Sequence, residues 1–290
     1  MRYKITHETE YNYSLPVTIS QHLIHLEPIE CKRQKWESHK IEITPYPAYK
    51  VSRKDIYGNK VTAFSIEDEH KFFKVTASGY VEVFADEFPQ ETPAWERVRD
   101  RLSNPQTEED IEASMFLFAS PLVVFDSAIK NYAKQSFTEE RPFSEALNEL
   151  NHRIYSDFTY VPGSTKIGTL PTEVLRDRKG VCQDFAHFMI ACLRSMGLSC
   201  GYISGYLHTR KNNDGPKLFG ADATHAWVSV YLPDFGYMEF DPTNDCVAGE
   251  EHIVVAKGRD FGDVSPLKGV ITGGGPHTLK VAVNVEKTTD

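Results

Sequence analysis

Hydrophobic and polar residues alternate with a period of two over much of the first 85 residues. In the segment from residue 2 to residue 13, Tyr3, Ile5 and Tyr11 are separated by mostly polar residues, which is typical of a half-buried strand. Similar runs follow as HKIEIT, NKVTAFSIE and KFFKVTASGYVEVF, and prolines and glycines between them supply turns. This spacing predicts a small all-β, sandwich-like unit.

A helical periodicity replaces this alternation after a charged, proline-containing connection at residues 86–110. The segment TEEDIEASMFLF opens with a threonine that can cap a helix, and SEALNELNHRIY repeats apolar residues at helical spacing. Strand-like runs return as CGYISGYLH, THAWVSVYL, YMEFDPT and HTLKVAVNV. We therefore predict an α+β protein with a β-rich domain at residues 1–100 and a mixed domain at residues 101–290. Six glycines and two prolines between Gly258 and Pro276 predict a surface loop there.

Composition and charge exclude several classes of protein. A chain of 290 residues, 40% hydrophobic and 25% charged, is long enough for two globular domains. A net charge of −9 argues against binding to nucleic acid. The N-terminal residues lack the apolar run of a signal peptide, and no window reaches the roughly 18 apolar residues of a membrane span. Five scattered cysteines without a C-x-x-C pair suit a reducing compartment, so we expect a soluble, cytoplasmic protein without membrane or nucleic-acid partners.

One cysteine lies between a glycine and an amphipathic helix, in the segment KGVCQDFAHFMIACLRSMGL. Apolar residues at helical spacing predict a helix with one buried face, and Gly197 can cap its C-terminal end. Cys182 then falls in the first turn, where unpaired N–H groups and the helix dipole favour the reactive thiolate. The N–H of Cys182 itself can donate to an oxyanion. A free cysteine is also often simply buried, and we expect Cys192 in the same helix to be inert packing.

A histidine and an aspartate on two neighbouring strands could complete such a site. His225 opens the strand of THAWVSVYL, and Asp241 ends the strand of YMEFDPTN. A nucleophilic thiol needs a base, and the base needs a group that fixes its tautomer. The two side chains share a face only if the hairpin loop near residues 233–236 has an odd length or a bulge, so we predict one. Each residue alone could equally be a half-buried polar group or a turn former.

These three segments, in this order, resemble the bacterial transglutaminase-like superfamily. MRYKITHETEYNYSLPV resembles the β-rich domain that precedes the core in a bacterial subgroup, and KGRDFGDVSPLKGVITGGG with HTLKVAV resembles its ending. The resemblance implies a papain-like core at residues 101–290, in which a cysteine-bearing helix packs on an antiparallel sheet. It also implies that Cys182 is the nucleophile, His225 the general base and acid, and Asp241 the orienting carboxylate. The chemistry implied is acyl transfer through a thioester, to water or to an amine.

The resemblance leaves the second oxyanion donor unassigned. Some relatives use a tryptophan upstream of the cysteine, and this chain has none between Phe158 and Cys182. Tyr160 and Gln183 are the candidates to replace it. No residue pattern calls for a cofactor or a metal, although zinc binding by Cys182 and His225 is an alternative that metal analysis would decide.

The function predicted first is that of a thiol-dependent hydrolase, a cysteine protease or amidase. Its substrate would be a peptide, a protein or a small amide. The alternatives are transglutaminase-type transfer to an amine and a catalytically idle binding protein on the same fold. The oligomeric state is left open.

Overall fold

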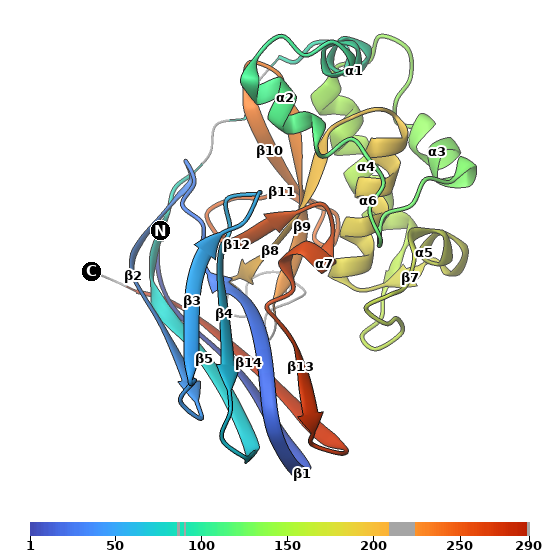
Figure 1. The fold of residues 1–290 in the computed structure, drawn as a ribbon. Coiled ribbons are helices and arrows are strands. Elements are labelled where there is room, and N and C mark those ends of the chain that lie inside the picture. Colours follow the sequence, from blue (N-terminus) through green and yellow to red (C-terminus); the bar gives the residue numbers. More distant parts are fainter. Residues whose placement is uncertain (86–87, 90, 209–223, 289–290) are drawn as a thin grey trace.

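The N-terminal part of the chain forms a large antiparallel sheet. The computed structural model describes residues 1–85, 88–89, 91–208 and 224–288, and the predicted α+β class is confirmed (Figure 1). Within these residues a seven-stranded sheet has the order β2-β5-β1-β4-β3, and β13 and β14 also pair with β1. Its strands are β1 (Arg2–Glu27), β2 (Gln34–Thr44), β3 (Tyr49–Lys54), β4 (Lys60–Ile66), β5 (His70–Val83), β13 (Leu267–Gly273) and β14 (His277–Lys287).

The long strand β1 belongs to both halves of this sheet. Its first half pairs with β5 and β14, and its second half pairs with β4 and β13, with an irregular register between Asn12 and Val17. Side chains of the two halves meet in one buried cluster, where the His22 ring stacks on Phe73 with centroids 4.3 Å apart and Phe64 lies beside them. The predicted sandwich-like arrangement is therefore confirmed.

The glycine-rich segment contains a strand that the sequence did not predict. Residues 267–273 form β13, which pairs with β1, so the expected surface loop at residues 258–276 is wrong in this stretch. A Cβ atom on Gly269 would lie 2.4 Å from the carbonyl oxygen of Gln21 and 2.6 Å from Nδ1 of His22. The glycine therefore permits close approach to β1. Residues 267–287, predicted to belong to the second domain, pair instead in the N-terminal sheet. Alternation along the chain reveals a strand but not the strand with which it pairs.

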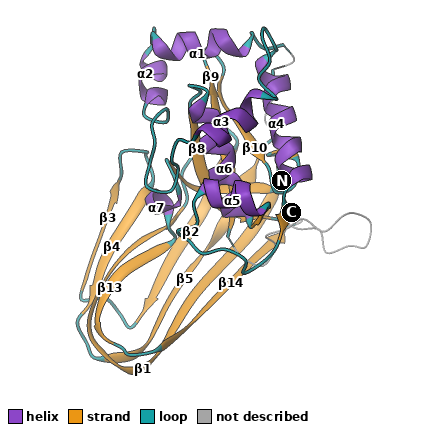
Figure 2. Ribbon diagram, turned by 90° about the vertical axis from the view of Figure 1, so that its right-hand side faces the viewer, coloured by secondary structure: helices purple, strands orange, loops and turns teal. Residues whose placement is uncertain are grey.

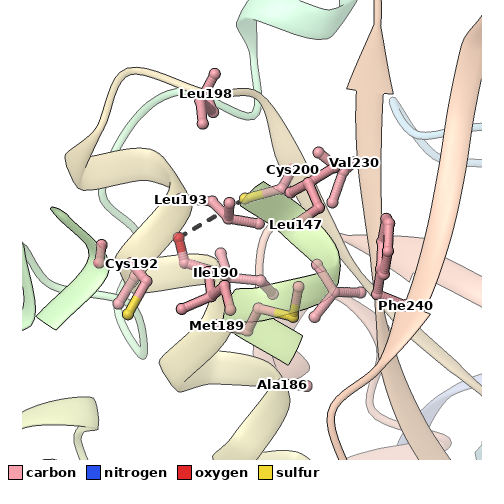
Figure 3. Close-up of a cluster of buried hydrophobic side chains, with 14 of the residues drawn as sticks. Leu147, Ala186, Met189, Ile190, Cys192, Leu193, Leu198, Cys200, Val230 and Phe240 are labelled. Carbon is pink, nitrogen blue, oxygen red and sulfur yellow. Dashed lines mark hydrogen bonds between the residues drawn. The ribbon is translucent and has the colours of Figure 1, made fainter. Parts of the chain in front are cut away.

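The second part of the chain packs helices on one face of a five-stranded antiparallel sheet. The sheet order is β11-β10-β9-β8-β12. Figure 3 shows Met189 and Ile190 of the central helix α6 beside Val230 and Phe240 of the sheet. Its strands are β8 (Cys200–Leu207), β9 (His225–Leu232), β10 (Gly236–Asp241), β11 (Cys246–Val247) and β12 (His252–Gly258), and β6 (Thr159–Tyr160) pairs separately with β7 (Lys179–Gly180). The helices are α1 (Trp95–Ser103), α2 (Glu108–Ser114), α3 (Ser127–Lys134), α4 (Phe143–Asp157), α5 (Pro171–Asp177), α6 (Cys182–Ser195) and α7 (Phe261–Val264).

The other face of the five-stranded sheet meets the N-terminal region. Trp227 and Val254 lie in a buried cluster with Ile29, which follows β1. In Figures 1 and 2, β1 and β14 extend below the five-stranded sheet. Arg33 and Gln34 are buried there and bind backbone groups of the segment at residues 249–254. No helix in the described part of the chain is long and apolar enough to cross a bilayer.

Candidate active site

The start of α6 is held by a carboxylate three residues after its cap. Cys182 is the first residue of the helix, as predicted, and its side chain is half-buried. Asp184 accepts hydrogen bonds from the N–H of Val181 at 2.8 Å and from the hydroxyl of Thr165 at 2.6 Å. A Cβ atom on Gly180 would lie 2.8 Å from Cβ of Asp184, so the glycine lets the carboxylate approach the chain. The buried Asp184 thus fixes the backbone of the first turn of α6, which carries Cys182.

The N–H groups of the first two residues of α6 lie outside the hydrogen bonds of the helix. The N–H groups of Asp184 and Phe185 donate to the carbonyl of Val181 at 2.9 and 3.1 Å. Helix geometry leaves the N–H groups of Cys182 and Gln183 without an acceptor inside the helix. The other end closes as predicted, because Gly197 has φ +80° and donates to the carbonyl of Arg194 at 3.0 Å.

The β9–β10 hairpin brings His225 and Asp241 together. Leu232 pairs with Gly236, so the loop between them has three residues, and the predicted odd-length connection is confirmed. This register places Asp241 diagonally across from His225. Nε2 of His225 and Oδ2 of Asp241 are 2.7 Å apart, and both side chains are fully buried.

The carboxylate of Asp241 accepts hydrogen bonds from three further residues. Oδ1 binds the N–H groups of Thr243 at 2.9 Å and Asn244 at 3.3 Å. Oδ2 binds the side-chain amide of Asn244 at 2.7 Å and Nε2 of His252 at 3.1 Å. Burial alone would raise the pKa of Asp241, but the charge and hydrogen bond of His225 and the hydrogen bond of His252 hold this pKa well below its usual range.

Asn244 and His252 were not predicted from the sequence. Asn244 follows Asp241 in the turn DPTN, and side-chain capping of such a turn was the available signal. His252 opens β12 at the far edge of the sheet, and no local pattern connects it with Asp241. Its position depends on the tertiary fold.

His225 combines a raised pKa with an available ring nitrogen. Burial lowers the pKa of His225, but the charge and hydrogen bond of Asp241 and the interaction with the Cys182 sulfur raise it to about 10. Nδ1 of His225 has no hydrogen-bond partner among the described residues, whereas Nε2 faces the carboxylate. A neutral ring would carry its proton on Nε2, opposite Asp241, so Nδ1 is the nitrogen that can exchange a proton with Cys182. Because the pKa of His225 is raised to about 10, the ring also holds the Nδ1 proton at neutral pH.

The two candidates for the second oxyanion donor are in different situations. Tyr160 pairs in the short β6–β7 ladder with Gly180, two residues before Cys182. Burial first, and then the charges of Cys182 and Asp184, raise the pKa of Tyr160 to about 12, so its hydroxyl keeps its proton at neutral pH. The side-chain amide of Gln183 instead donates to the carbonyl of Ile167 at 3.1 Å. The role of second oxyanion donor stays a prediction for both residues.

One group of side chains in the described residues is close enough together to hold a metal ion. The ligand atoms of His225, Asp241 and His252 lie within 4.8 Å of one another. Both Nε2 atoms approach the same carboxylate oxygen at hydrogen-bond distance, at 2.7 and 3.1 Å. N–H donors account for these contacts. Zinc binding by Cys182 and His225 stays an alternative for metal analysis.

The α6 helix packed on an antiparallel sheet defines an α+β fold of the papain-like type. A crystal structure from Cytophaga hutchinsonii, described as that of a candidate cysteine protease, has the same fold with a TM-score of 0.79. It is 19% identical in sequence and covers 100% of this chain and 92% of that one.

Sequence comparison gives the family. Residues 3–82 match the bacterial transglutaminase-like N-terminal region, and residues 130–242 match the transglutaminase-like superfamily. An uncharacterized protein of Mycobacterium tuberculosis is 39% identical over 98% of this chain and 92% of its own length. A protein-glutamine gamma-glutamyltransferase of Pseudomonas aeruginosa is 28% identical over 40% of this chain and 18% of its own length. The chain belongs to the transglutaminase-like superfamily and carries the N-terminal region of its bacterial members.

Proposed function

We propose that this protein is a thiol-dependent hydrolase of amide bonds. The observation that carries the proposal is the buried His225–Asp241 pair. Nδ1 of His225, the ring nitrogen that does not face Asp241, is left for the thiol at the start of α6. We expect a peptide, a protein or a small amide as the substrate, neither a nucleic acid nor a membrane as partner, and a cytoplasmic location.

The acylation step follows from the positions of these groups. With its raised pKa, His225 already holds on Nδ1 the proton that comes from the Cys182 thiol, and the sulfur attacks the amide carbonyl carbon. The oxygen that becomes negative is stabilised by the N–H of Cys182 and by the hydroxyl of Tyr160. The C–N bond then breaks, and the imidazolium of His225 gives its proton to the leaving amine. Asp241 keeps the imidazole in the tautomer that this exchange requires.

The second half of the reaction decides the class of enzyme. Water, deprotonated by His225, attacks the thioester, the C–S bond breaks, and the sulfur of Cys182 recovers a proton as the carboxylic acid leaves. A primary amine in place of water gives the transglutaminase-type product. The side chains described here serve either acceptor, and we place hydrolysis first.

Heavy-oxygen water distinguishes these outcomes without a known substrate. The protein is incubated with a mixture of peptides in ¹⁸O-labelled water, with and without an added primary amine, and the peptides are analysed by mass spectrometry. Hydrolysis puts one heavy oxygen into each newly formed carboxyl group, whereas amine transfer adds the mass of the amine.

Two cysteine variants control this assay. Cys182→Ala should abolish both products and remain folded, because the side chain is small and half-buried. Cys31→Ala, at another half-buried cysteine whose burial raises the thiol pKa, should keep wild-type turnover. Wild-type turnover by a folded Cys182→Ala protein would end the proposal. A wild-type protein whose Cys182 reacts no faster than a free thiol would favour the idle binding protein instead.

A further inference from the structure

A second histidine shares the carboxylate that orients His225. His252 opens β12, is 4% exposed, and places its Nε2 atom 3.1 Å from Oδ2 of Asp241. Its ring lies edge-on to Trp227 with centroids 5.3 Å apart, and Trp227 in turn stacks on His225. The imidazoles of β9 and β12 thus meet at a carboxylate from β10.

The backbone around His252 determines which ring nitrogen carries the proton. The N–H of Gly249 donates to Nδ1 of His252 at 3.3 Å. Because an N–H group can only donate, Nδ1 must be the acceptor, and the proton of the neutral ring is on Nε2. His252 therefore donates to Asp241, as His225 does.

This tautomer depends on a residue of the N-terminal region. Arg33 donates from Nη1 to the carbonyl of Gly249 at 3.0 Å and from Nη2 to the carbonyl of His252 at 2.8 Å. Its guanidinium also pairs with Glu239 at 3.1 Å. Arg33 consequently fixes the turn whose N–H group selects the tautomer of His252.

We propose that His252 is a positioning residue of the catalytic site, which donates a hydrogen bond to the Asp241 carboxylate and so weakens the stabilisation that this carboxylate gives to the protonated ring of His225. The proposal rests on the function proposed above. A donor on Oδ2 withdraws negative charge from the oxygen that also accepts from His225, so the imidazolium of His225 is stabilised less than it would be by an unshared carboxylate. Loss of the donor should leave Asp241 in place, because the N–H groups of Thr243 and Asn244 still bind Oδ1.

The pH dependence of Cys182 alkylation tests this role without a substrate. Three titratable groups of the described residues face His225: Cys182 from α6, Asp241 from β10 and His252 from β12. The side-chain amide of Asn244 also lies near the ring and is uncharged. Cys246 beside Asp241 stays protonated, because its thiol pKa is raised to about 12, chiefly by burial. The rate of alkylation by iodoacetamide, mapped to Cys182 by peptide mass spectrometry, should show a lower transition for thiolate formation and an upper one for loss of the His225 proton.

Two variants at one position separate the donor from the packing. His252→Phe keeps a ring against Trp227 but donates nothing, and the upper transition should rise by about one pH unit. His252→Gln restores an N–H donor and should return the transition to near its wild-type pH. His7→Leu is the control, because His7 is another buried histidine, which contacts Tyr206 at 3.0 Å and does not contact Asp241. It should leave the transition unchanged.

Each result has a separate meaning. An upper transition in His252→Phe that equals that of His7→Leu, or that falls, would overturn the inference while the proposed function stands. A wild-type protein without pH-dependent activation of Cys182 would overturn both. If His252→Phe does not fold, ¹⁵N NMR of the histidines in the wild-type protein decides, since a proton on Nδ1 rather than Nε2 of His252 contradicts the proposal.

Discussion

Arg33 is a buried cation that joins the N-terminal region to the strand bearing His252. The residue is 4% exposed, and its guanidinium contacts Glu239 and the carbonyls of Gly249 and His252. Glu239 is largely buried and also accepts from the indole N–H of Trp227 at 2.7 Å. Replacement of Arg33 by methionine would keep the aliphatic volume and leave a buried carboxylate without its cation.

The expected loss of stability is large for a single substitution. Removal of one partner from a buried ion pair costs about 3–5 kcal/mol, because the remaining charge is desolvated without compensation. Arg33→Met should therefore lower the free energy of unfolding by about 3–5 kcal/mol. The double variant Arg33→Met with Glu239→Gln should regain a substantial part of this loss, since the glutamine still accepts from Trp227 and carries no charge.

An exposed ion pair supplies the matched control. Arg2 and Glu37 are 2.6 Å apart, but their side chains are 38% and 37% exposed. Arg2→Met should cost no more than about 1 kcal/mol. Urea unfolding followed by tryptophan fluorescence measures all four proteins, and Trp227 lies beside the altered pair. If Arg33→Met and Arg2→Met lose the same stability, the buried pair does not hold the two parts together as described.

Two further predictions concern the start of α6 and the response to pH. The pKa of His225 is raised from 6.5 to about 10, so its contribution to the free energy of unfolding is complete below pH 6.5 and is lost as the pH rises towards 10. The pKa of Asp241 is lowered, so its contribution is present above the ordinary value of 3.8 and is lost in acid. Asp241→Asn should therefore flatten the fall in the urea midpoint between pH 7 and 10, and a wild-type decline that persists in the variant would contradict the assignment. Gly180→Ala should displace the Asp184 carboxylate, lower stability by about 1 kcal/mol and slow Cys182 alkylation. Gly168→Ala, where a Cβ atom meets nothing within 4 Å, is its control in thermal unfolding, and equal behaviour of the two would refute the steric argument.

Local patterns predicted the parts of the site that depend on neighbouring residues. The apolar spacing after Cys182 marked α6, and the parity of β9 and β10 required the three-residue loop that brings Asp241 to His225. Side-chain direction alternates strictly along a strand, so an error of one residue would have separated the pair. The parity depends only on the two adjacent strands and the loop between them.

The parts that were missed depend on contacts between distant segments. His252 reaches Asp241 because β12 pairs with β8 at one edge of the sheet and Arg33 holds the preceding turn. Likewise, β13 owes its extended form to its pairing with β1. Its glycines predict a loop from the sequence alone, because the pattern does not show that the backbone of β1 passes close by. Secondary-structure propensity describes a segment by itself, whereas the tertiary pairing of strands decides the structure of β12 and β13.

The pairing of β13 and β14 with β1 has a consequence for biosynthesis. The segment that forms α1 to β12 lies between two stretches of chain that belong to one sheet. A ribosome must therefore deliver the whole intervening core before β1 can acquire its neighbours on that side. Until then the nascent β1 presents an open edge, and assembly of the sheet waits for a closure of very long sequence separation.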